Sequence, residues 1–92
     1  MNQCVLIHFK GDFSNQEMRD FMLKTARTLS LEGIAQLIEV DTVKIVTCGK
    51  KENIEQFIDA LHKSSGIYQL TEIVIEPFYK QKEYRGVFRI IE

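Results

Sequence analysis

The sequence predicts an α+β sandwich, in which two helices cover one face of an antiparallel sheet. Two segments repeat apolar residues at helical spacing, and the clearer of them runs from Ile54 to Leu61 at i, i+3, i+4 and i+7. The other apolar runs are short and rich in β-formers, which is typical of strands. Neither helical segment is apolar on more than one side, so each is expected to bury a single face.

The first strand is expected over Cys4–Phe9, where Val5, Ile7 and Phe9 share one parity and predict the better-buried face. A polar break at residues 10–12 ends it. Helical spacing then begins behind Ser14-x-x-Glu17, a capping box in which the hydroxyl and the carboxylate satisfy the first free amides of a helix.

The first helix is expected to bury Met18, Met22, Ala26 and Leu29, with Phe21 beside them, and to end near Ser30. Ile34–Val40 and Val43–Cys48 then read as two strands of a hairpin, separated by only two residues. The second helix follows, and the Ser-Ser-Gly sequence at residues 64–66 is expected to stop it.

The last two strands are expected over Ile67–Ile75, closed by Pro77, and over Tyr84–Ile91. A polar turn, Lys80–Glu83, separates them. The predicted order is therefore βαββαβ with a terminal strand, which is the ferredoxin-like arrangement. This fold class hosts many unrelated activities and does not by itself define a function.

Composition limits the functions that this fold can carry. The chain has 92 residues, 45% of them hydrophobic and 27% charged, and a net charge of −1, which fits one folded domain over residues 1–92. The charge balance argues against a nucleic-acid surface. No apolar stretch is long enough to span a membrane, and the first residues do not read as a signal peptide, so a cytoplasmic location is expected.

Two cysteines, Cys4 and Cys48, lie far apart in the sequence and form no CxxC motif. Free buried thiols are the expectation for a cytosolic chain. Their shared parity on antiparallel neighbouring strands leaves a bond between them as the minor alternative.

The even-numbered residues of the first and third strands should face away from the helices. This set contains Leu6, His8, Val46 and Cys48 and is more apolar than an uncovered sheet needs, so a weak homodimer is the alternative to a monomer. His8 and His62 lack visible ligand partners and are interpreted as structural or surface residues.

Two common sites of ferredoxin-like domains are not supported. A metal-carrying version needs paired cysteines in the first loop, Lys10–Gln16, which has none. An RNA-binding version needs aromatic residues on the central strands, and Val43–Thr47 has none. Phe78–Lys82 mixes aromatic and basic residues, but a solvated turn explains it as well as a binding patch does.

A third comparison fits better. Gly11 and Arg19 match the ends of a G-x-V-Q-G-V-x-F-R loop, Leu29–Gly33 matches L-x-L-x-G, and Val43 and Gly49 fall in register with a following N-x(5)-V segment that ends in Gly. No gap is needed between Gly11 and Gly49. In these motifs the chain resembles the acylphosphatase family, and the resemblance covers nearly the whole sequence.

The resemblance implies hydrolysis of carboxyl-phosphate anhydrides, without a metal or a cofactor. The backbone amides of Phe13, Ser14, Asn15 and Gln16 would hold the phosphoryl oxygens, and Arg19 would anchor the phosphate. The alternative for Arg19 is an exposed helical side chain that faces nearby carboxylates. A small anion or an acyl phosphate is the expected ligand.

The site departs from the family pattern at several positions. Leu37 occupies the position of the asparagine that orients the attacking water, and it has no group that can bond to water. The loop lacks the family's internal glycine, and Asp12 and Glu17 add negative charge to it. In the capping-box interpretation, Ser14 and Glu17 also use amides that a phosphate would need.

These departures favour a catalytically degenerate acylphosphatase-like protein that retains weak anion binding. One alternative is an active acylphosphatase, with Arg19 as its anchor and with a water oriented by the backbone or by Asn15. The other alternative is a protein-interaction module that uses the open face of the sheet.

Overall fold

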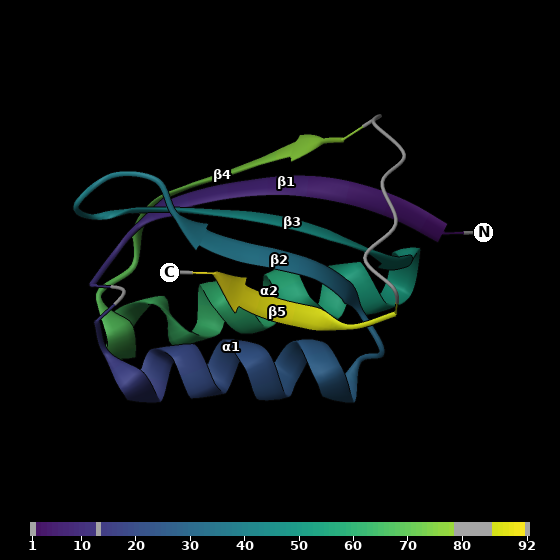
Figure 1. Ribbon diagram of the computed structural model, residues 1–92, viewed down its shortest axis with the longest axis horizontal. Coiled ribbons are helices and arrows are strands. Elements are labelled where there is room, and N and C mark those ends of the chain that lie inside the picture. The colour runs from purple at the N-terminus through teal and green to yellow at the C-terminus, as the bar shows by residue number, and fades with distance from the viewer. Residues whose placement is uncertain (1, 13, 79–85, 92) are drawn as a thin grey trace.

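The computed structural model describes residues 2–12, 14–78 and 86–91, and it confirms the α+β sandwich (Figure 1). A five-stranded sheet has the order β4-β1-β3-β2-β5, and both helices lie on one side of it. In chain order the elements are β1 (Asn2–Lys10), α1 (Gln16–Thr28), β2 (Glu32–Leu37), β3 (Thr42–Lys50), α2 (Lys51–Tyr68), β4 (Thr71–Pro77) and β5 (Phe88–Ile91).

The sheet is mixed, whereas the sequence predicted an antiparallel one. Three pairs are antiparallel (β1 with β3, β1 with β4, and β2 with β3), but β5 runs parallel to β2. The reason is the chain path: β5 reverses the direction of β4 and joins the opposite edge of the sheet, where β2 already runs in that new direction.

The core lies between the helices and the sheet face that the odd-numbered residues of β1 and β3 form. The predicted apolar face of β1 is confirmed, with Ile7 and Phe9 fully buried. Both helices bury the expected stripe. The core side chains of the helices and of β3 are Met18, Met22, Ala26, Ile54, Phe57, Leu61, Val43 and Ile45.

The start of α1 differs from the predicted capping box. Asn15 is the N-cap, and its side-chain Oδ1 accepts a hydrogen bond from the amide of Met18 at 3.2 Å. Ser14 does not cap the helix, because its amide and its hydroxyl both donate to the carboxylate of Asp12. The cap therefore lies one residue later than the Ser-x-x-Glu spacing indicates, since an asparagine at this position serves at least as well.

The second helix is longer than the sequence predicted. The hydroxyls of Ser64 and Ser65 donate to the carbonyls of Leu61 and His62, so both serines satisfy their polar groups within the helix instead of ending it. The helix continues to residue 68 and ends at Gln69 in the left-handed conformation. The strand expected from residue 67 consequently begins only at residue 71.

Cys4 and Cys48 form a disulfide, so the expectation of two free thiols is wrong. The two residues are direct partners in the antiparallel β1–β3 ladder, and their Cα atoms are 4.0 Å apart. This register brings the two side chains together on the open face of the sheet. The expectation of free thiols assumed a cytosolic chain, in which disulfides are rare.

The polar turn expected at residues 80–83, most of the aromatic and basic stretch at residues 78–82, and the beginning of the last expected strand lie outside the described residues. Within the described part, β5 begins at Phe88. Neither α1 nor α2 is long and apolar enough to cross a membrane.

Two glycines of the recognised motifs have a packing explanation. Gly33 has a φ of +146°, and a Cβ built on it would lie 2.0 Å from the backbone carbonyl oxygen of Val46. A Cβ on Gly49 would lie 2.5 Å from a methyl group of Leu31. Gly33 therefore lets β2 and β3 approach closely, and Gly49 leaves room for the Leu31 side chain, so both positions have a role in packing.

Candidate anion site

The fold brings the candidate site residues to one end of the sheet. The β1–α1 loop and the β2–β3 hairpin lie at this end (Figure 1), and the Gly11 amide joins them by donating to the carbonyl of Asp41 at 2.8 Å. Arg19 lies in the first turn of α1, and Leu37 is the last residue of β2. Phe13, one of the predicted loop residues, lies outside the described residues.

Asp12 accepts hydrogen bonds from several donors of the predicted anion loop. Its Oδ1 accepts a bond from the Ser14 amide at 3.0 Å and another from the Ser14 hydroxyl. Its carbonyl accepts from the Asn15 amide at 3.1 Å. The bonds from Ser14 hold the pKa of the Asp12 carboxyl below its usual value of 3.8, so the loop carries a negative charge of its own at neutral pH.

The side chains of the next two loop residues are engaged within the chain as well. Asn15 caps the helix through its Oδ1, as described above. Gln16 donates from its Nε2 to the Oδ1 of Asp20, one turn further along α1, at 2.8 Å. The loop is therefore organised by its own polar side chains, and this arrangement stabilises the start of α1.

Arg19 is half-buried, and its Nε atom is shielded from solvent. Its amide donates to the carbonyl of Asn15 at 3.1 Å, which places the residue in the first full turn of the helix. A helix N-terminus favours negative charge, and a guanidinium presents a planar fork that suits phosphate. This position is consistent with the predicted phosphate anchor.

Leu37 presents an apolar surface at the same end of the sheet. Its register partner on β3 is Val43, which is fully buried, whereas Leu37 is 38% exposed. Its neighbour Ile38 is 46% exposed. At the position that corresponds to the family's asparagine, the chain thus offers no side-chain hydrogen bond to a water.

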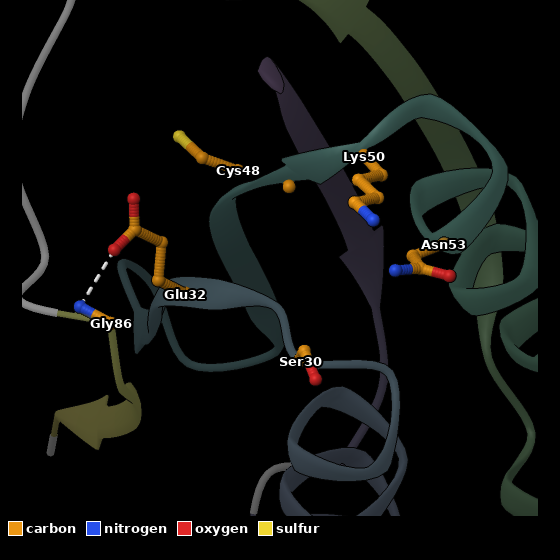
Figure 2. Close-up of a pocket in the computed structure, with 7 residues that line it drawn as sticks. Ser30, Glu32, Cys48, Lys50, Asn53 and Gly86 are labelled. Atoms are coloured by element: carbon orange, nitrogen blue, oxygen red, sulfur yellow. Dashed lines mark hydrogen bonds between the residues drawn. The ribbon is translucent and has the colours of Figure 1, made fainter. Parts of the chain in front are cut away.

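A pocket that the sequence did not indicate lies at the other end of the sheet (Figure 2). Nine residues of β3 separate the two ends, which corresponds to about 26 Å. The pocket has a volume of about 320 Å³ and is lined by Ser30, Glu32, Cys48, Gly49, Lys50, Asn53 and Gly86.

Its polar groups have mixed character. Lys50 and Asn53 point their nitrogen atoms into the pocket, while the Glu32 carboxylate turns toward Gly86 and accepts a bond from its amide at 2.7 Å (Figure 2). No sequence motif could have revealed this pocket, because its lining comes from β2, β3, α2 and the segments that precede β2 and β5. Within the described residues, no cluster of three or more His, Cys, Asp or Glu side chains could hold a metal ion.

The fold and the loop together define a small ferredoxin-like domain with an arginine at the start of its first helix. The family model of acylphosphatase matches residues 5–90, which is nearly the entire chain. The chain belongs to the acylphosphatase family, as the resemblance in its motifs indicated.

Individual relatives agree with this family. An acylphosphatase from Methanococcoides burtonii is 37% identical over 59 residues, which cover 64% of this chain and 62% of the relative. The crystal structure of acylphosphatase from Bacillus subtilis superposes with a TM-score of 0.83 at 20% identity and covers all of both chains. An acylphosphatase from Coxiella burnetii gives a TM-score of 0.81 at 19% identity and covers 98% of this chain and 93% of its own. These two structural similarities concern the fold.

Proposed function

We propose that this protein is an acylphosphatase-family member with little or no acyl-phosphate hydrolysis, which retains weak binding of small anions near Arg19. The observation that carries the proposal is the Asp12 carboxylate, which accepts two hydrogen bonds from Ser14 in the loop that corresponds to the family's phosphate loop. A phosphate that enters this loop must displace the carboxylate and also overcome its charge.

The position of Leu37 supports the same conclusion for the chemical step. Hydrolysis needs an oriented water, and such positioning and electrostatic stabilisation supply most of the catalysis where no covalent nucleophile or metal takes part. Leu37 cannot orient a water. The Oδ1 of Asn15, which was the alternative group, already caps α1.

Arg19 favours a second candidate, an active acylphosphatase. It lies at the position of the family's arginine, in the first turn of a helix that begins directly after the loop. In this case the backbone would orient the water, and hydrolysis would depend on the Arg19 guanidinium.

The test is hydrolysis of a simple acyl phosphate by wild type, Leu37→Asn and the double variant Asp12→Ala/Leu37→Asn. We expect wild-type rates near the uncatalysed background. The hydrolysis rate of the double variant should be at least about tenfold higher than that of wild type, because one preorganised group typically contributes about 100-fold or more to the rate. Adding Arg19→Ala to the double variant should abolish the gain.

Asp12→Asn is the matched control for Asp12→Ala. It removes the charge but keeps an oxygen that accepts from Ser14, whereas alanine removes both. Robust hydrolysis by wild type that Arg19→Ala abolishes would overturn the proposal and establish the active enzyme. Phosphate titration followed by NMR of the loop amides measures the retained anion binding independently of turnover.

A further inference from the structure

The face of the sheet opposite the helices has a self-complementary arrangement of charge. Register pairs define an inner row across all five strands, in the order Glu76, Leu6, Val46, Ile34, Arg89. An outer row, nearer the β2–β3 hairpin, has the order Val74, His8, Lys44, Gln36, Ile91. The inner row thus begins with a carboxylate on one edge strand, ends with a guanidinium on the other, and is apolar between them.

Neither described helix covers these two rows, because both lie on the opposite face (Figure 1). Phe78 packs against Val46 and the neighbouring disulfide, so the disulfide end of the face is partly closed. Glu76 and Arg89 are exposed, and so are Val74 (48%) and Ile91 (38%). The available surface is therefore the outer row together with the two charged ends of the inner row.

We propose that this face binds a second copy of the same chain, with a two-fold axis parallel to β3. Rotation about such an axis places β4 over the partner copy's β5, and β1 over its β2. Glu76 then faces Arg89 of the other copy, and this ion pair occurs twice. Val74 faces Ile91 in the same way, so charge and apolar surface are both matched.

Other arrangements are disfavoured by the same charges. A two-fold axis perpendicular to the strands would place β4 over β4 and bring Glu76 near Glu76 and Arg89 near Arg89. Both axes keep the strands of the two sheets nearly aligned, as face-to-face sheets prefer, so the charges decide between them. The one charge mismatch of the parallel axis within the two rows is Lys44, which lies on the axis and faces its own copy.

The size of the face indicates a weak dimer. Five strands about 4.8 Å apart and two rows of side chains about 7 Å apart along the strands give a footprint of about 300–350 Å² per copy. Stable interfaces usually bury about 800 Å² per partner. We therefore expect dissociation in the high-micromolar to millimolar range, with ion pairs that weaken at high salt.

Charge reversal tests the pairing. Sedimentation velocity of wild type from about 10 µM to about 1 mM should show a dimer fraction that grows with concentration. Glu76→Arg and Arg89→Glu should each weaken dimerisation about tenfold, because each variant opposes like charges at both contacts. An equimolar mixture of the two variants should associate again, since both contacts then join opposite charges.

Two further variants separate this face from other surfaces. Lys44→Gln should strengthen the dimer several-fold by removing the like-charge contact on the axis. Glu55→Arg, an equal charge change at an exposed position of α2, should leave it unchanged. A wild type that stays monomeric throughout, reversals without effect, or a mixture that fails to associate would each overturn the proposal.

Discussion

Reducing the disulfide between Cys4 and Cys48 should strongly destabilise the fold. The bond closes a segment with a sequence separation of 44 residues, which contains α1, β2 and most of β3. In the chain-entropy model, a loop of this length is worth about 4 kcal/mol at 25 °C, because the crosslink restricts the unfolded chain. With a urea m value of about 2 kcal/mol per M, the unfolding midpoint should fall by about 2 M.

The assay is urea unfolding, followed by circular dichroism, of the oxidised protein and of protein treated with a dithiol reductant. Thiol titration in denaturant counts the free thiols in each sample. The Cys4→Ser/Cys48→Ser variant should resemble the reduced protein, and the reductant should not change its midpoint. Equal urea midpoints for samples with two and with zero titratable thiols would refute the reasoning, because the bond would then not restrict the unfolded chain.

Three other changes have clear expected outcomes. Asn15→Ala should lower the free energy of unfolding by about 1 kcal/mol through loss of the α1 N-cap, whereas a conventional capping box would assign that loss to Ser14→Ala; urea unfolding compares the two variants. Gly33→Ala should lower the free energy of unfolding by about 3 kcal/mol or more, because its Cβ meets the Val46 carbonyl. Gly66→Ala, in open space on α2, should raise it by about 0.5–1 kcal/mol. The folded-state pKa of Asp12 is lowered, so its stabilising effect should be present above pH 3.8 and fade as the pH falls through the lower folded value. NMR titration of its carboxyl carbon should give a midpoint below 3.8. A higher midpoint would contradict the hydrogen bonds from Ser14.

Most of the fold could be predicted because it depends on periodicity. The alternation in β1 and the helical spacing from Met18 to Ala26 both reflect the buried face that tertiary packing then fills. The predictions were wrong where a polar side chain could form its hydrogen bond in more than one local structure. Ser64 and Ser65 look like a helix end, but a hydroxyl that bonds back to its own helix lets the helix continue.

The disulfide shows a different limit of sequence reasoning. Parity placed Cys4 and Cys48 on the same face, yet parity alone does not determine strand register. A shift of two residues would preserve every buried side chain of β1 and separate the two sulfur atoms. Only the observed ladder, in which the two cysteines are direct partners, brings them within bonding distance.

The candidate site could be located from the sequence, but its internal hydrogen bonds could not. Motif spacing placed Arg19 at the start of a helix and Leu37 at a strand end, and the fold brings both to one end of the sheet. The sequence alone predicted that the negative charge of Asp12 would repel a phosphate. Its specific contacts with Ser14 depend on the loop conformation, which no residue pattern specifies.

Those contacts change what the negative charge of Asp12 means for binding. A carboxylate that is tethered two residues from its donor competes with free phosphate at an effective concentration of at least about millimolar. Repulsion alone would be relieved equally by Asp12→Asn and Asp12→Ala. Competition for the Ser14 amide is relieved fully only by alanine, because asparagine keeps an acceptor. A phosphate affinity that rises further in Asp12→Ala than in Asp12→Asn would therefore identify the carboxylate as a resident anion in the loop, whereas equal affinities would reduce its role to charge.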